Sequence, residues 1–177
     1  IVGFGAPFLE KKLPEGLNLI VGALAIAPLA RIIAIAVDPV VNSTLLNIGR
    51  MISAAAEQSP LIMGFLLGGI MKMICTSPLS SMALTAMLGL DGLAMGIAAI
   101  ACVGGSFTNG IIFDRLKLGE RSNVIAVMLE PLTQADIITQ NPIPIYGSNF
   151  FGGGLAGLAA AMLGIINNAP GTASPIP

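Results

Sequence analysis

Long apolar runs separated by short polar segments dominate the chain. Three of the runs are about as long as the roughly 20 residues that a helix needs to cross a bilayer. They cover residues 16–37, 59–75 and 92–113. Only Arg31 interrupts the first run, and Asp38-Pro39 closes it, because the residue before a proline is disfavoured in the helical region. The pattern predicts transmembrane helices over these runs, the first of them ending at Asp38.

Polar residues between Val40 and Glu57 fall on one side of a predicted helix. They recur at spacings of four, three and seven residues, which is the period of a helical face. They are Ser43, Asn47, Arg50 and Glu57. Such a helix either lies in the membrane interface or lines a polar cavity, and the sequence leaves both readings open.

Small residues mark two apolar segments as closely packed helices. Gly64 and Gly68 stand in GxxxG register within the run 59–75, and Gly153 and Gly157 repeat that spacing near the C-terminus. Glycine lets the backbones of two membrane helices approach closely. We therefore expect both pairs at helix–helix contacts.

Two regions carry breaks inside apolar surroundings. The stretch 79–90, introduced by Thr76-Ser77-Pro78, forms a helix of only about 18 Å, which indicates a half-helix or re-entrant segment. From Glu130 to Asn149, polar groups alternate with prolines. Backbone broken at membrane depth must be buried in protein or line a cavity, since lipid offers it no hydrogen bonds. The predicted fold is an all-α polytopic integral membrane protein with broken helices and re-entrant segments.

Composition supports this class and excludes others. Of 177 residues, 55% are hydrophobic and 10% charged, with a formal net charge of −1 and a mean hydropathy of +0.90. A soluble domain carries roughly 25% charged residues, and a disordered chain has low hydrophobicity and high net charge. Nucleic-acid binding leaves a basic footprint, which is absent from this sequence. The expected surroundings are therefore a lipid bilayer, with no nucleic acid as a partner.

Candidate chemistry is restricted by what the sequence lacks. There is no histidine, so histidine-based acid–base chemistry and histidine metal sites are absent, and catalysis would need carboxylates alone. We predict no catalytic residue, no metal site and no cofactor. Cys75 and Cys102 lie in apolar stretches, which favours small packing residues over a disulfide.

The strongest candidate site is the polar segment that begins at Glu130. Pro131 suits the first position of a helix, which would make Glu130 its N-cap and place Gln134 one turn along. Asp136 and Asn141 follow in the same proline-broken region. A carboxylate with neighbouring amides offers the acceptors and donors that sugar hydroxyl groups need. The same oxygens also suit hard cations, so an ion remains a competing ligand.

The segment 114–123 concentrates charge between apolar runs. It holds five of the chain's 17 charged side chains, three of them basic. We predict a solvated loop, and the positive-inside rule places it in the cytoplasm.

Three stretches resemble a known family. They are VMLEPLTQADIITQNPIPIYGSNFFGGG at 127–154, NNAPGTASPI at 167–176 and TSPLSS at 76–81. They are similar to the perfringolysin-regulator (PfoR) type branch of the EIIC membrane proteins of the phosphotransferase system. Glu130-Pro131 is also similar to the Glu-Pro of the GITEP element with which sugar EIIC proteins hold substrate, although Val-Met-Leu stands here in place of Gly-Ile-Thr. Tyr146, Ser77 and Asn167 lie in these stretches and complete the candidate substrate-binding residues.

The resemblance implies a multi-pass permease domain in the bacterial cytoplasmic (inner) membrane. It implies a sugar as solute, a homodimer, and separate IIA and IIB proteins as phosphoryl donors, because no phosphoryl-acceptor residue is evident in this chain. We expect residues 1–177 to form one transmembrane domain and to be a fragment of a longer EIIC-like protein. Two alternatives stay open: a membrane-embedded ligand sensor that regulates gene expression, and an ion-coupled secondary transporter with Glu130 and Asp136 as cation or proton sites.

Overall fold

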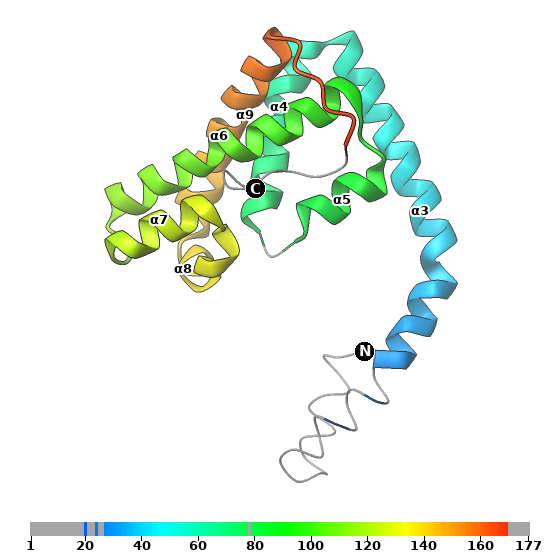
Figure 1. Ribbon diagram of the computed structural model, residues 1–177, viewed down its shortest axis with the longest axis horizontal. Helices are drawn as coiled ribbons and strands as arrows, with labels where there is room; N and C mark the ends of the chain where they lie inside the picture. Colours follow the sequence, from blue (N-terminus) through cyan, green and yellow to red (C-terminus); the bar gives the residue numbers. More distant parts are fainter. Residues whose placement is uncertain (1–19, 21–23, 25–26, 78, 170–177) are drawn as a thin grey trace. The chain divides into compact units, whose positions relative to one another are not determined.

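The regular structure of the described chain is entirely helical. The computed structural model describes residues 20, 24, 27–77 and 79–169 (Figure 1). Seven α-helices and one 3-10 helix occupy these residues. They are α3 (Ala27–Gln58), α4 (Pro60–Thr76), α5 (Ser81–Leu88), α6 (Gly92–Leu116), α7 (Arg121–Leu129), η2 (Pro131–Gln134), α8 (Ala135–Gln140) and α9 (Pro142–Met162). The expected all-α class is confirmed. Most of the predicted run before Ala27, and the NNAPGTASPI motif beyond Ala169, lie outside the described residues.

Two compact units make up the chain, Ile1–Thr44 and Leu45–Pro177, with their boundary inside α3. In the first unit the large apolar side chains of α3 are exposed, among them Leu29, Ile32 and Ile35 at 54%, 63% and 60%. Helices α3 and α6 are both long and apolar enough to cross a membrane. An apolar helix with an uncovered surface is what a lipid-facing segment requires.

The predicted helix end at Asp38 is wrong. Helix α3 continues through Pro39 to Gln58, so residues 40–57 are not a separate helix. A proline inside a helix removes one backbone hydrogen bond, whereas ending the helix there would leave about four carbonyls without partners. Where lipid offers no hydrogen bonds, the uninterrupted helix is the less costly choice.

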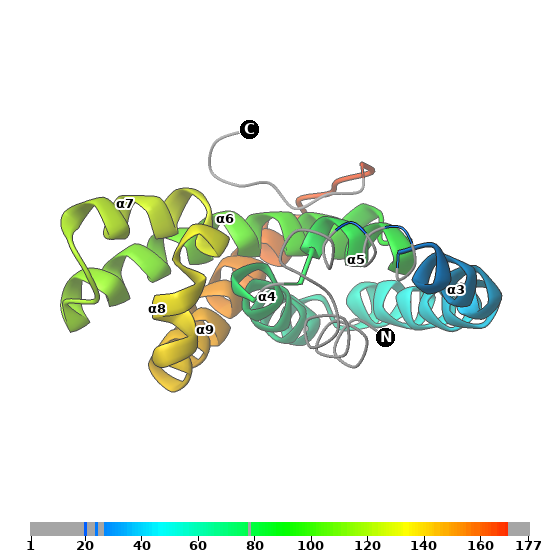
Figure 2. The same ribbon diagram turned by 90° about the horizontal axis from the view of Figure 1, so that it is seen from below.

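The core of the second unit lies where α4, α6 and α9 pack together (Figures 1 and 2). The α4–α9 contact is built on glycine: a Cβ on Gly68 would come within 2.5 Å of the Gly153 carbonyl oxygen and 2.9 Å of the Gly157 Cα. A Cβ on Gly64 would lie 2.8 Å from the Cβ of Ala161. Both predicted glycine contacts are therefore confirmed, and they are the two sides of one interface.

The second half of α3 also contributes to this core. Leu45 and Ile52 pack against it, and Gly49 and Ala56 are buried on the same face. A Cβ on Gly49 would collide with the backbone of Leu88 at the end of α5. The predicted polar residues of this stretch lie on the exposed remainder of the helix.

A short helix, α5, forms within the predicted 79–90 segment. The Ser80 hydroxyl caps it by accepting a hydrogen bond from Ala83 N at 3.2 Å, and Gly89 ends it with a φ of 60°. Eight residues span about 12 Å, too little to cross a bilayer. That a re-entrant path runs through this segment stays a prediction.

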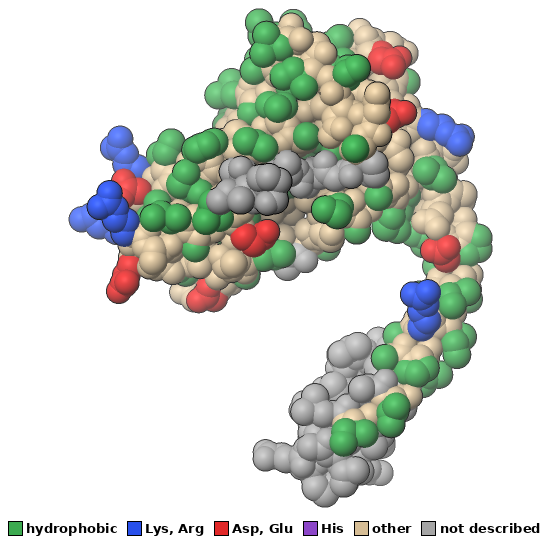
Figure 3. Space-filling view, viewed as in Figure 1, with side chains coloured by type: hydrophobic (Ala, Val, Ile, Leu, Met, Phe, Trp, Pro, Cys, Tyr) green, Lys and Arg blue, Asp and Glu red, His purple; other side chains and the backbone are tan. Residues whose placement is uncertain are grey.

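The region 114–149 is more regular than predicted. Helix α6 extends to Leu116 and α7 begins at Arg121, so the predicted loop 114–123 reduces to a four-residue turn. Basic side chains gather at this end of the molecule (Figure 3). The chain is broken from Glu130 to Asn141, but Pro142 starts α9 instead of disrupting it. A proline at the first helical position costs nothing, because its missing N–H would have no intrahelical partner.

Candidate functional site

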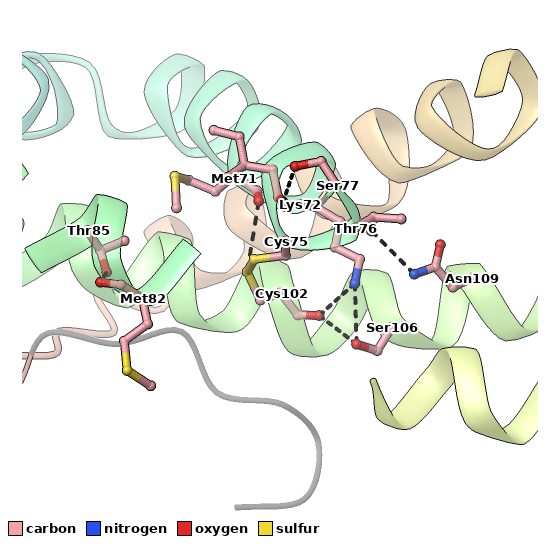
Figure 4. The surroundings of a disulfide bond; sticks show 11 residues. Met71, Lys72, Cys75, Thr76, Ser77, Met82, Thr85, Cys102, Ser106 and Asn109 are labelled. Atoms are coloured by element: carbon pink, nitrogen blue, oxygen red, sulfur yellow. Dashed lines mark hydrogen bonds between the residues drawn. A yellow bond between two sulfur atoms is a disulfide. The ribbon is translucent and has the colours of Figure 1, made fainter. Parts of the chain in front are cut away.

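A buried lysine occupies the junction of α4 with α6. Lys72 is only 1% exposed, and its Nζ donates to the carbonyl oxygen of Cys102 at 3.2 Å and to Ser106 Oγ at 3.3 Å (Figure 4). Ser106 Oγ in turn donates to the Cys102 carbonyl at 2.9 Å. A lysine is almost never fully buried without a functional or pairing reason. This side chain is therefore the first indication of a site.

Glycines on two neighbouring helices make room for Lys72. A Cβ on Gly105 of α6 would lie 2.5 Å from Lys72 Cδ and 2.6 Å from its Cε. A Cβ on Gly153 of α9 would collide with the Cβ of Lys72. The aliphatic part of the Lys72 side chain is thus packed between the backbones of α6 and α9.

Further buried amide and hydroxyl groups lie one helical turn beyond Lys72. Asn109 of α6 donates through Nδ2 to Thr76 Oγ1 at 3.3 Å (Figure 4). Asn149 of α9 lies one turn before Gly153, which packs on Lys72. Both asparagines are buried, at 1% and 0% exposure.

Three polar atoms in this cluster have no hydrogen-bond partner within the described part of the chain. They are Asn109 Oδ1, Asn149 Nδ2 and Asn149 Oδ1. Buried polar atoms normally find a partner, since leaving one unsatisfied costs about 1–3 kcal/mol. We call Lys72, Ser106, Asn109 and Asn149 the buried polar cluster.

A disulfide stands beside this cluster, which corrects the prediction for the two cysteines. Cys75 of α4 and Cys102 of α6 are bonded, with their Cα atoms 6.4 Å apart (Figure 4). That separation lies within the range that a disulfide spans. Their apolar neighbours in the sequence gave no sign that α4 and α6 would place the two side chains opposite each other. The bond holds α4 to α6 within one turn of Lys72.

Glu130 has the local geometry that its sequence predicts. It is exposed and caps η2, with Pro131 at the start of that short helix and Oε1 accepting from Leu132 N at 3.3 Å. Gln134 is buried, and its Oε1 accepts from Asn123 Nδ2 of α7 at 2.6 Å. Gln134 Nε2 donates to the Thr133 carbonyl at 2.9 Å. The amide thus ties η2 to α7.

The other predicted site residues are engaged mainly with their own neighbourhoods. Asp136 is exposed in the first turn of α8, and Asn141 Nδ2 donates to the Ile137 carbonyl at 3.1 Å. Tyr146 packs on a second apolar cluster. Ser77 Oγ donates to the Ile74 carbonyl at 2.7 Å, and Asn167 Oδ1 accepts from Ala169 N at 2.9 Å. In the described part of the chain, no hydrogen bond joins two of the seven predicted side chains directly.

Packing connects the predicted segment with the helix of the buried lysine. Helix η2, which Glu130 caps, contacts α4, the helix that carries Lys72. The predicted residue Glu130 and the lysine that was not predicted therefore lie on elements that are in contact. Within the described residues, no group of three His, Cys, Asp or Glu side chains could hold a metal ion.

Comparison with known families matches the whole chain, residues 1–177, to the family described as "Phosphotransferase system, EIIC". The protein is a member of that EIIC family. Membership implies a sugar-permease-type membrane component of a phosphotransferase system. It also implies that this EIIC protein works with phosphotransferase-system partners on a sugar-type substrate. No curated protein and no solved structure matches the chain.

Sequence reasoning missed the buried polar cluster of this EIIC protein for an identifiable reason. Lys72 lies near the end of an apolar run, where a lysine side chain usually extends to the membrane interface. Asn109 neighbours a glycine, which indicated a kink. The available signal was the small residue on each partner helix, Gly105 and Gly153, but only the packing of three helices shows that both face Lys72.

Proposed function

We propose that this EIIC protein binds and translocates a small polar solute, a sugar, across the bacterial cytoplasmic membrane. The observation that carries the proposal is the match of all 177 residues to the EIIC family. Polar groups buried at the packing centre of α4, α6 and α9 support it, because a membrane domain buries a charged side chain for function more often than for stability.

Within that function, Glu130 is proposed as the residue that accepts hydrogen bonds from solute hydroxyl groups. Its carboxylate is exposed at the break between α7 and η2, so a solute can reach it. Gln134, Asp136, Asn141, Tyr146, Ser77 and Asn167 are proposed as further contacts of the solute. Of these, Gln134 also fixes the segment against α7.

The assembly proposed for this protein follows from the resemblance of its motifs. We place it in the PfoR-type branch of the family, as a homodimer whose phosphoryl groups come from separate IIA and IIB proteins. The residues that support this placement are those of the runs 127–154 and 76–81.

Replacement of Glu130 by glutamine tests the site. Glu130→Gln keeps the side-chain size and removes the charge. Loss of a charge-assisted hydrogen bond should weaken solute binding by roughly 10-fold to 150-fold. Calorimetry on detergent-solubilised protein, titrated with hexoses, sugar acids and cations, measures this change.

A control variant shows whether the loss of any exposed carboxylate weakens solute binding, or only the loss of Glu130. Glu57→Gln removes an exposed carboxylate from α3 and should leave affinity unchanged. If Glu130→Gln folds normally and binds the wild-type ligand equally well, Glu130 is not part of the site. If it loses only cation binding, the protein is an ion-coupled transporter instead.

A further inference from the structure

Neither of the groups that accept a hydrogen bond from Lys72 carries a negative charge. Its two acceptors, the Cys102 carbonyl and the Ser106 hydroxyl, are both neutral. The Glu130 carboxylate is exposed, and one of its oxygens accepts a hydrogen bond from Leu132 N. A buried ammonium held only by neutral groups is costly, since desolvation must be repaid by a close opposite charge and further hydrogen bonds.

Asparagines on the two helices that pack against α4 provide both kinds of hydrogen-bonding group that a hydroxylated ligand needs. Asn149 offers an unpartnered donor and acceptor, and Asn109 an unpartnered acceptor. Both side chains are buried, so their hydrogen-bonding capacity is directed into the protein interior.

The position of Lys72 is fixed by the close packing of its stem. Gly105 and Gly153, on different helices, both admit the lysine stem at distances where any side chain would collide. The disulfide from Cys75 to Cys102 fixes α4 against α6 beside the carbonyl that Lys72 contacts. Such a rigid frame holds the ammonium in place, which is what recognition of a charged group requires.

We infer that the buried polar cluster, Lys72, Ser106, Asn109 and Asn149, binds the anionic group of a hydroxylated solute. The ligand class is a sugar-like oxyanion, with either a carboxylate or a phosphate at Lys72. Its hydroxyl groups bind the two asparagines. The inference rests on the proposed function, because it specifies the charge of the solute that the membrane domain binds.

An anion fits these observations better than a neutral sugar. A neutral ligand would satisfy the asparagine amides but would leave the ammonium without a close counter-charge. An oxyanion supplies that charge and accepts a hydrogen bond from the remaining N–H of Lys72, because an ammonium has three donors and the protein occupies two.

Two substitutions at one position test the charge directly. Ser106 lies 3.3 Å from Lys72 Nζ, so Ser106→Asp places a carboxylate next to the ammonium and mimics the bound anion. Ser106→Asn has nearly the same size and no charge. The aspartate variant should show a higher melting temperature than the asparagine variant. It should also bind the anionic ligand roughly 10-fold to 150-fold more weakly.

Calorimetry uses three matched probes: a hexose, the corresponding hexuronate and the hexose 6-phosphate. Binding of the hexuronate or of the phosphate identifies which oxyanion is the ligand. Equal affinity of the two variants for the anions, or a melting temperature of the aspartate variant no higher than that of the asparagine variant, would overturn the inference.

The outcomes also separate this inference from the proposed function. Binding of the hexose alone, weakened by Glu130→Gln but equal in the two Ser106 variants, would overturn the anion assignment and leave the sugar permease intact. Failure of the wild-type protein to bind any of the three probes would overturn both.

Discussion

At the scale of single residues, glycine decides whether a charged side chain fits between helices. Gly105 is the residue of α6 that faces the stem of Lys72, with three of its carbons within 2.6 Å of an added Cβ. These atoms belong to a side chain held at its far end by two hydrogen bonds. Lys72 therefore cannot move aside without breaking contacts with Cys102 and Ser106.

We expect Gly105→Ala to destabilise the protein by about 1–3 kcal/mol, the usual cost of overpacking a core. Gly147→Ala is the matched control, because Gly147 lies in α9 with nothing within 4 Å of an added Cβ. There the gain in helix propensity, up to about 1 kcal/mol, should leave stability equal or higher. Melting curves in detergent compare the two. Equal effects would show that Lys72 does not occupy the space beside Gly105.

Residue roles that depend on neighbours in sequence could be predicted, whereas those that depend on distant helices could not. Glu130 as a cap followed by Pro131 is a local pattern, and the structure has it. The contact of Lys72 with Ser106 joins residues 34 positions apart. No period or spacing in one sequence fixes which face of α4 meets which face of α6.

At the scale of elements, apolar periodicity located the helices better than it located their ends. The runs 59–75 and 92–113 correspond to α4 and α6. The errors fall at prolines: Pro39 lies inside α3 and Pro142 begins α9. A proline lacks one backbone N–H, so one helix carbonyl loses its hydrogen bond. Whether the helix continues depends on the cost of leaving that carbonyl without a partner. That depends on surroundings which the local sequence does not specify.

We predict that the close glycine packing between α4 and α9 is needed for stability. Replacing Gly64 and Gly68 together by leucine should separate α4 from α9, because even a Cβ at Gly68 comes within 2.5 Å of the Gly153 carbonyl. We expect a clear fall in melting temperature, by several degrees or more for a change above 1 kcal/mol. Gly147→Leu makes the same substitution where an added Cβ meets no atom within 4 Å. An unchanged melting temperature for the double variant would place this face of α4 against lipid instead.

At the scale of the whole molecule, we predict the orientation in the membrane from α6. Its 25 residues extend about 37 Å, enough to cross a hydrocarbon core of about 30 Å. Asp91 precedes its first residue, and the turn after its last carries the basic group Arg115, Lys117 and Arg121. Basic residues remain preferentially on the cytoplasmic side. The turn between α6 and α7 should therefore face the cytoplasm, with Asp91 outside.

Cysteine labelling tests this orientation, and the disulfide simplifies it. Cys75 and Cys102 are bonded to each other, so a cysteine introduced at an exposed position is the reactive thiol. In intact cells, Asp91→Cys should react with a membrane-impermeant maleimide, whereas Ser122→Cys, at the start of α7, should react only in inside-out vesicles. Both positions are exposed in the folded protein, so lack of reaction reports the membrane and not burial. The reverse pattern would invert the topology, and labelling of both cysteines from one side would mean that α6 does not cross the bilayer.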